Sequence, residues 1–274
     1  MKTNKICLVL LALSLSLSAC NYSKSNGESE FSVGGFSLGS SEGKGALIDK
    51  TYTFNFDEIK TSNSLDVEIV KSNTEKIVVN APSDIIDKIE VTQEGSTAII
   101  RVAKGVRNLS TNRVRVKVYA KDFSKLSTSS SSTVKVLDSF KSDKFDIQAS
   151  SSSTIKGDFD AANVSIQVNS SADFYGQVIA KNVVAQVSSS GTLSMKGRSE
   201  NLSGQASSSG DLEAAEFTAD TATLQASSSG GIKVGVRNSV TGSASSSADI
   251  VVLKRGDLKN VTVKESSSGS VSVK

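Results

Sequence analysis

Apolar residues in the second half of the chain recur at one fixed place within a serine-rich unit of about 20 residues. Eight such units follow one another: Ser127–Val134, Gln148–Ile155, Gln167–Phe174, Gln186–Leu193, Gln205–Leu212, Gln225–Ile232, Ser243–Ile250 and Lys264–Val271. Their first residues lie 21, 19, 19, 19, 20, 18 and 21 positions apart, and each unit ends on an apolar residue. A serine-rich sequence of low complexity would not place an apolar residue at the same position of every unit. The constant period with strand-like alternation predicts the regular, stacked coils of a β-solenoid over residues 126–274.

Residues 51–125 alternate between apolar and polar positions without so plain a repeat. Tyr52, Phe54 and Phe56 alternate with polar residues, and this period of two predicts short strands rather than helices. Lys60–Val67 fits the serine-marked unit loosely and begins 67 residues before Ser127. We therefore expect degenerate coils in this region and an all-β chain of about 11–12 coils, roughly 55 Å long at ~4.8 Å per coil. A separate cap over residues 51–125 is the alternative.

Strand alternation also assigns side chains to faces. Val164, Ile166 and Val168 point to one side, and continuing the alternation places Ser170 on that same inner side. By this reasoning the middle serine of each triplet faces inward as a structural ladder: Ser130, Ser151, Ser170, Ser189, Ser208, Ser228, Ser246 and Ser267. A small residue two positions later would then mark a narrow corner. Since an unsatisfied buried hydroxyl costs about 1–3 kcal/mol, stacked hydroxyls would have to satisfy one another.

Glutamines recur on the opposite side of the predicted strands. They occupy positions 148, 167, 186, 205 and 225, and stacked amides bond to one another along the axis of such a solenoid. We interpret this ladder as structural in the first place, with ligand binding as the alternative.

Composition excludes several kinds of chemistry. The chain of 274 residues has no histidine, which removes the Ser-His and Cys-His nucleophile pairs and the commonest metal ligand. Asp173, Asp211 and Asp249 share one repeat position, but Gly231 interrupts the series, and turn aspartates usually serve local turns. We therefore predict no enzyme activity, no catalytic residues, no metal and no cofactor. A polysaccharide-degrading β-helix enzyme is the least favoured alternative.

The charge balance indicates no nucleic-acid partner. The formal net charge is +3, and Lys2 and Lys5 lie in an N-terminal targeting segment. Without these two lysines the chain has 29 basic and 28 acidic residues, a net charge of +1. No stretch interleaves arginine with aromatic residues as single-strand binders do.

The N-terminus resembles a lipoprotein signal. A basic start and the apolar run from Ile6 to Leu17 precede Leu17-Ser-Ala-Cys20, which resembles a bacterial lipobox. The resemblance implies removal of residues 1–19 and acylation of Cys20. Loss of Cys7 with the signal would leave Cys20 as the single cysteine. Several acyl chains anchor a protein firmly, so we expect a membrane partner through lipid, with an ordinary signal peptide as the alternative.

Residues 20–50 are rich in glycine and serine and predict a flexible linker with a reach of roughly 30 Å. The alternative is that Phe31, Val33, Phe36 and Leu38 dock on the domain. No later stretch reaches the ~18 apolar residues of a membrane-spanning helix. Asn21 after the cysteine lacks the aspartate associated with inner-membrane retention, which favours the outer membrane.

Three features together resemble one protein family. They are the lipobox, Phe56-Asp-Glu-Ile-Lys60, and tandem units such as Ala206-Ser-Ser-Ser-Gly-Asp-Leu212. They resemble the autotransporter adhesin family known as the head GIN domain, over residues 51–273. The resemblance implies a right-handed parallel β-helix in exported proteins, frequent in Bacteroidetes-type bacteria, and supplies no catalytic residue.

From these features we expect an envelope lipoprotein that acts as an adhesin or as a surface or periplasmic binding module for glycan or cell envelope. A structural protein that self-associates through exposed strand edges is the alternative. The sequence leaves open the ligand, the side of the membrane and the oligomeric state.

Overall fold

The computed structural model describes residues 24–25, 28–29, 32–33, 36–37 and 41–274. The predicted signal (1–19), Cys20, and the docking of Phe31 and Leu38 lie outside these residues. The described chain divides into two units, one ending at Glu42 and including Arg107–Ser110, the other formed by Gly43–Val106 and Thr111–Lys274. The smaller unit contains paired two-residue strands: β1 (Lys24–Ser25) with β2 (Glu28–Ser29), β3 (Ser32–Val33) with β4 (Phe36–Ser37), and β5 (Ser41–Glu42) with β12 (Leu109–Ser110).

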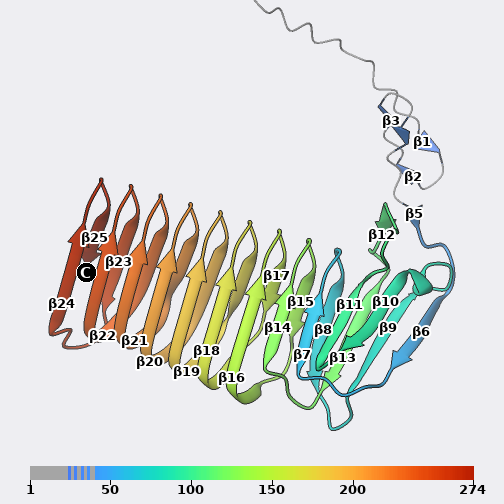
Figure 1. The fold of residues 1–274 in the computed structure, drawn as a ribbon, viewed down its shortest axis with the longest axis horizontal. Coiled ribbons are helices and arrows are strands. Elements are labelled where there is room, and N and C mark those ends of the chain that lie inside the picture. The colour runs from blue at the N-terminus through green and yellow to red at the C-terminus, as the bar shows by residue number, and fades with distance from the viewer. Residues whose placement is uncertain (1–23, 26–27, 30–31, 34–35, 38–40) are drawn as a thin grey trace, which may run out of the picture. The chain divides into compact units, whose positions relative to one another are not determined.

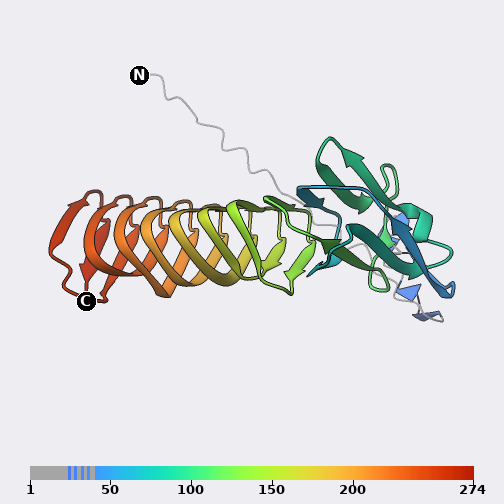
Figure 2. The same ribbon diagram turned by 90° about the horizontal axis from the view of Figure 1, so that it is seen from below.

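Stacked parallel coils make up most of the larger unit (Figures 1 and 2). Each coil runs along a first sheet, turns at the serines, and returns along a second sheet. The first sheet contains β7 (Glu58–Thr61), β14 (Lys125–Thr128), β16 (Phe140–Ala149), β18 (Phe159–Val168) and β24 (Asn260–Glu265). The second contains β8 (Asp66–Lys71), β15 (Thr133–Val136), β17 (Thr154–Lys156), β23 (Asp249–Lys254) and β25 (Ser270–Val273). Four long strands contribute to both sheets: β19 (Asp173–Val187), β20 (Thr192–Ala206), β21 (Asp211–Ala226) and β22 (Gly231–Ala244).

The repeat read from the sequence sets the register of this stack. Gln148, Gln167, Gln186, Gln205 and Gln225 pair in succession, and Phe174, Leu193, Leu212, Ile232 and Ile250 do the same inside. The predicted all-β parallel solenoid is thus confirmed for the described chain.

Apolar side chains fill the space between the two sheets. Near the first serine-marked coils, Phe123, Phe140, Phe145, Phe159 and Phe174 contact one another with ring centroids 4.9–6.0 Å apart. Later coils bury mainly leucine, isoleucine, valine and alanine, together with Met195 and Phe217. Each fully buried large side chain contributes about 1.5–3 kcal/mol, so the same apolar position repeated in every coil is the main stabilising element of the stack.

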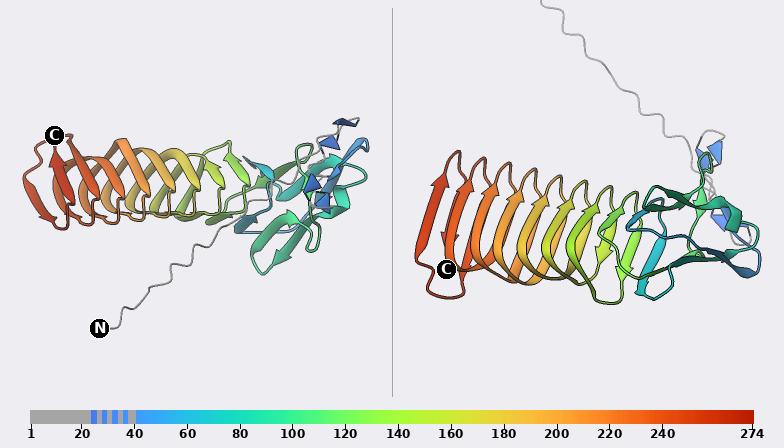
Figure 3. Two further views of the ribbon diagram at one scale, coloured as in Figure 1. Left: turned by 90° about the horizontal axis from the view of Figure 1, so that it is seen from above. Right: turned by 60° about the horizontal axis from the view of Figure 1, so that its bottom comes forward.

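The N-terminal end of the larger unit departs from the coil pattern. Strands β6 (Leu47–Tyr52), β9 (Lys76–Pro82) and β13 (Arg115–Ala120) extend the second sheet with antiparallel pairings, while β13 also pairs in parallel with β8. Strand β11 (Thr97–Val102) pairs in parallel with β7, and β10 (Ile89–Glu94) closes a hairpin onto β11. A 3₁₀ turn, Ile86–Lys88, precedes β10. Figure 3 shows these strands gathered at one end of the stack.

The number of coils is therefore lower than expected. Among the described residues, eight serine-marked coils are joined by one further coil, made by β7 and β8. The estimate of 11–12 coils was wrong because strands of antiparallel hairpins and strands of parallel coils both alternate apolar and polar residues with a period of two. The sequence pattern therefore does not distinguish them. Strand β6 also begins at Leu47, within the segment assigned to the linker. Its residues are largely exposed, so no buried alternation marked them as a strand.

Within the described part of the chain, no helix is long and apolar enough to cross a membrane.

Candidate functional site

Every serine-marked coil changes sheet through a turn with two residues in the left-handed conformation. In one coil Ser208 and Ser209 have φ values of 50° and 60°, and the Gly210 N–H donates to the Ser207 carbonyl at 2.9 Å, as in a type I′ turn. A non-glycine residue in this conformation costs on the order of 1–3 kcal/mol unless its surroundings hold it there. The neighbouring coil holds the turn in this conformation, because the Ser209 N–H donates to the Ser228 carbonyl at 3.0 Å. The same bond repeats between the turns of successive coils.

These turns correct the predicted direction of the serine side chains. The middle serines are exposed rather than inward: Ser130, Ser151, Ser170, Ser189, Ser208, Ser228, Ser246 and Ser267. These serines do form a ladder along the axis, because the backbone carbonyl of each accepts an N–H from the turn of the neighbouring coil. The prediction failed because it assumed that side chains continue to alternate between inward and outward across the turn. Two left-handed residues turn the chain there, so the alternation is interrupted. The small residue two positions later is buried in most coils, as in Ala172 and Gly210.

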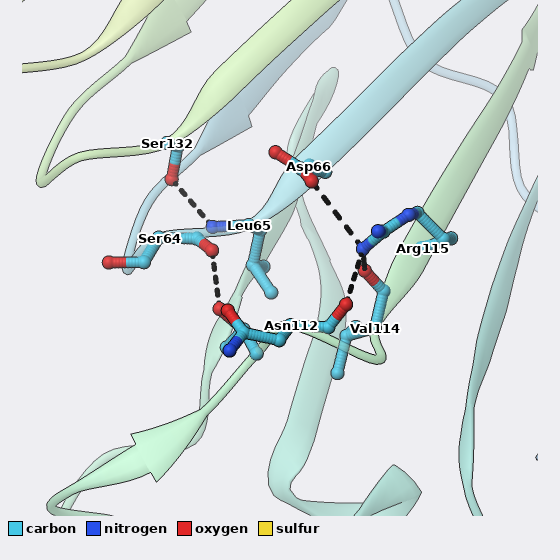
Figure 4. Close-up of polar contacts among 8 residues, drawn as sticks. Ser64, Leu65, Asp66, Asn112, Val114, Arg115 and Ser132 are labelled. Atoms are coloured by element: carbon cyan, nitrogen blue, oxygen red, sulfur yellow. Dashed lines mark hydrogen bonds and ion pairs between the residues drawn. The ribbon is translucent and has the colours of Figure 1, made fainter. Parts of the chain in front are cut away.

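The coil made by β7 and β8 has the same turn, although its sequence is not a serine triplet. Asn63 and Ser64 have φ values of 69° and 56° and align with Ser130 and Ser131. The Leu65 N–H donates to the Ser132 Oγ at 3.2 Å (Figure 4). Asparagine tolerates the left-handed region well. Asn63 in this degenerate copy was therefore a residue whose type indicated a left-handed turn.

The strands around this first turn fix it from the other side. The Thr111 Oγ1 donates to the Ser64 carbonyl at 2.6 Å. The Arg115 guanidinium donates to the carbonyls of Asn112 and Val114 and lies 3.4 Å from the Asp66 carboxylate (Figure 4). Because Arg115 belongs to β13, the antiparallel strands are bonded directly to the first coil.

The outer side of the first sheet, from β18 to β22, is an ordered array of uncharged side chains, which we call the amide–hydroxyl face. Four columns of five residues form it: Asn163, Asn182, Asn201, Thr221, Ser239; Ser165, Val184, Ser203, Thr223, Thr241; Gln167, Gln186, Gln205, Gln225, Ser243; and Asn169, Ser188, Ser207, Ser227, Ser245. None of these twenty residues is charged, and only Val184 is apolar. The columns repeat every ~4.8 Å along the axis and about every 7 Å along the strands.

Hydrogen bonds along the axis hold the amides of this face in place. The Asn182 Nδ2 donates to the Asn163 Oδ1 at 2.8 Å, and the Asn201 Nδ2 donates to the Asn182 Oδ1 at 3.0 Å. The Gln186 Nε2 donates to the Gln205 Oε1 at 3.2 Å. Each amide still has a donor and an acceptor site that neighbours do not use. The sequence predicted the glutamine ladder; the asparagine ladder became visible only in the register of the coils.

A shallow hollow of about 230 Å³ lies on this face between the glutamine column and the serine turns. Rigid donors and acceptors around it suit a ligand that is itself rich in hydroxyl groups and carries no charge, because no unpaired charge would have to be desolvated.

The repeat-position aspartates do not form a catalytic cluster. Thr192 lies between Asp173 and Asp211 in register, and Gly231 lies between Asp211 and Asp249. In the described residues, no group of three or more acidic, cysteine or histidine side chains could hold a metal ion.

The fold and its ladders define a parallel β-solenoid protein with a serine turn in every coil. The chain belongs to the family described as "putative auto-transporter adhesin, head GIN domain", which matches residues 55–256. The family resemblance predicted from the repeats is thus confirmed. No curated protein matches the chain.

Solved structures of similar proteins share this fold. A "putative adhesin" from Parabacteroides merdae superposes with a TM-score of 0.77 at 15% identity, covering 86% of this chain and 99% of its own. A "putative adhesin" from Parabacteroides distasonis gives a TM-score of 0.75 at 16% identity, covering 85% and 99%. A "putative lipid binding protein" from the same species gives 0.68 at 20% identity, covering 86% and 99%.

Proposed function

We propose that this protein is a lipid-anchored binding module of the bacterial cell envelope, adhesin in type, which attaches to neutral glycan through the amide–hydroxyl face. The observation that carries the proposal is the array of twenty uncharged residues on five consecutive coils. Its family and two of its solved relatives are named as adhesins, which supports a binding role over catalysis.

Many weak contacts held in a fixed arrangement would supply the affinity of this face. A single neutral hydrogen bond contributes only about 0.5–1.5 kcal/mol after water is displaced. The backbone ladder and the amide bonds already order these side chains, so little conformational entropy remains to be lost on binding. A repeated surface engaging a repeated polymer adds its contacts by multivalency.

The anchor is the second part of the proposal. The lipobox-like Leu17-Ser-Ala-Cys20 and the absence of any other cysteine after Cys7 support acylation at Cys20. Asn21 supports placement at the outer membrane, and the glycine- and serine-rich residues that follow support a tether between lipid and solenoid.

A sedimentation assay with insoluble neutral polysaccharides and purified cell wall tests the face. The full chain, purified in detergent, is compared with Ser203→Arg, which places a long charged side chain at the centre of the face. Thr192→Arg is the matched control, because Thr192 points outward from the second sheet between Asp173 and Asp211. We expect Ser203→Arg to lower the bound fraction and Thr192→Arg to leave it unchanged. Equal binding by both variants, or no binding to any polymer, would reject the proposal.

Self-association is a second candidate, supported by the strands at the far end of the stack. Val261 and Val263 of β24 occupy inward positions yet are each 44% exposed, and β24 and β25 have unpaired edges in the described chain. Exposed edges pair readily with other strands. Light scattering over a range of concentrations tests this candidate, and a strict monomer throughout would count against it.

A further inference from the structure

A long hollow lies away from the amide–hydroxyl face, at the bend where coils leave the second sheet. It has a volume of about 770 Å³. Its long side is one column of residues in register: Lys156, Tyr175, Ser194, Glu213 and Lys233. These residues come from five successive coils, so the groove extends for roughly 19 Å along the axis at ~4.8 Å per step.

The floor of the groove beside Tyr175 is low because the chain has no room for side chains at Gly157 and Gly176. A Cβ at Gly176 would lie 1.8 Å from the Gly157 carbonyl oxygen of the neighbouring coil. A Cβ at Gly157 would lie 2.7 Å from the Val136 Cβ. The adjacent column carries long side chains, which form a wall beside this low floor. The hollow is therefore built by the sequence of the coils and needs no movement to open.

Tyr175 provides an aromatic surface in the middle of the groove. Its side chain is 41% exposed, unlike the buried phenylalanines of the core. The Lys156 Nζ lies 5.5 Å from the ring centroid and helps to fix the ring. Burial, together with the carboxylates of Asp173 and Glu213, raises the pKa of Tyr175 above its ordinary value.

Charged groups of both signs line the groove, and the Asp173 carboxylate acts on Tyr175 in addition. Three lysines and three acidic residues line the groove: Lys156, Lys196, Lys233, Asp158, Glu213 and Glu216. None of these six makes an ion pair within the described residues, while the Asp158 carboxylate accepts the Gln177 N–H at 2.8 Å. Such a set offers strong donors and strong acceptors side by side, which is what sugar hydroxyls need because each one both donates and accepts. A polyanion would be attracted by the lysines but repelled by at least as many carboxylates.

We propose that this groove is a second binding site, which takes a single linear oligosaccharide of no net charge along the solenoid axis, with one sugar ring stacked on Tyr175. An aromatic surface among a few fixed polar groups is typical of small-ligand sites and suits the C–H face of a pyranose ring. The site does not depend on binding at the amide–hydroxyl face. With both sites occupied, one molecule would hold a glycan on each of its two sheets.

Calorimetry and amide NMR with soluble linear oligosaccharides test the groove directly. The probes are oligomers of glucose, N-acetylglucosamine, mannose and, as the acidic comparison, galacturonate, added to the full chain in detergent. We expect a neutral oligomer to bind, and Tyr175→Ala to weaken that binding by about tenfold. Tyr175→Phe should keep most of the affinity because the ring remains. Tyr119→Ala is the matched control, since Tyr119 also lies on the outer side of the second sheet, next to Lys117 but outside this groove.

Salt separates the neutral ligand from an acidic one. Binding of a neutral oligomer should be nearly unchanged in 1 M salt, where the Debye length is only ~3 Å. The proposal is overturned if only galacturonate oligomers bind and salt abolishes their binding, if no oligomer binds, or if Tyr175→Ala and Tyr119→Ala bind alike. Ser203→Arg should leave the part of the binding that depends on Tyr175 unchanged, because Ser203 lies on the other sheet. If Ser203→Arg weakens oligomer binding while Tyr175→Ala does not, the oligomer binds the amide–hydroxyl face. The groove proposal then fails, whereas the proposed function still stands.

Discussion

The small residue at the inner corner after each serine turn offers a sharp test of how closely the coils pack. A Cβ added at Gly230 would lie 2.6 Å from the Ala206 carbonyl oxygen and 2.8 Å from the Ser207 nitrogen. These are backbone atoms of the neighbouring coil, held there by the ladder of turn hydrogen bonds, so they cannot rotate away. Gly230→Ala must therefore separate two coils locally, and overpacking of this kind costs about 1–3 kcal/mol.

Gly191→Ala is the matched control at the same position of another coil. The closest atoms to its new Cβ would be the Val168 Cγ1 at 3.1 Å and the Ser188 oxygen at 3.2 Å. A shift of a few tenths of an ångström relieves these contacts, and Ala172 and Ala248 already carry a methyl group at this corner. The loss of chain freedom in the unfolded state favours alanine by ~0.4–1 kcal/mol, so we expect a change near zero.

Urea denaturation and amide hydrogen exchange measure the difference. Stacked repeats often unfold in parts, so exchange at the turn amides is the more direct readout. A cost of about 2 kcal/mol corresponds to roughly 30-fold faster exchange around Ser229 in Gly230→Ala. If both variants show the same stability and exchange, the coils adjust their spacing freely and the argument from backbone contact is refuted.

Four further predictions concern other features. Ser208→Gly should be neutral or stabilise the chain by up to ~1 kcal/mol, because glycine adopts the left-handed turn without strain, whereas Ser208→Val should lower the urea midpoint; a clear loss of stability in the glycine variant would contradict the exposed, left-handed assignment. The amides of Lys44 and Gly45 donate to the Asp84 carboxylate and lower its pKa; this stabilising contribution is present above the ordinary carboxyl pKa of ~3.9 and is lost as pH falls through the lower folded value. The protection of the Gly45 amide, measured relative to its intrinsic exchange rate, should therefore fall in acid in the native chain but show no such step in Asp84→Asn. Because the pKa of Tyr175 is raised, the folded chain keeps that proton longer than the unfolded chain, so stability should be unaffected below the ordinary tyrosine pKa of ~10 and should fall above it; Tyr175→Phe should remove this part of the pH dependence in denaturation series, and an unchanged profile would contradict it. Cys20→Ser should shift the protein from the membrane fraction to the soluble fraction and abolish labelling by a fatty-acid analogue, and retained labelling would disprove acylation at Cys20.

The solenoid and its register could be predicted because they depend on a one-dimensional pattern. An apolar residue at the same place in every unit must be buried, and stacking equivalent units is the arrangement that buries them all. That pattern led from Val134, Ile155 and Phe174 to the coils, the glutamine ladder and the family. It failed over residues 76–102, where period-two alternation fits an antiparallel hairpin as well as a coil.

The chemistry of the surface depends on distances between coils, which the sequence does not contain. The direction of Ser208 is set by a left-handed turn that the neighbouring coil stabilises, and only the stacked backbone shows it. Likewise, Tyr175 looks isolated along the chain, yet register places it between Lys156 and Ser194, above a floor that Gly157 and Gly176 keep low. The sequence by itself determined the repeat, the β-solenoid and the family, because burial of apolar residues follows the order of the chain. Beyond the glutamine ladder, tertiary structure decided which polar groups meet at the surface, because those groups come from different coils.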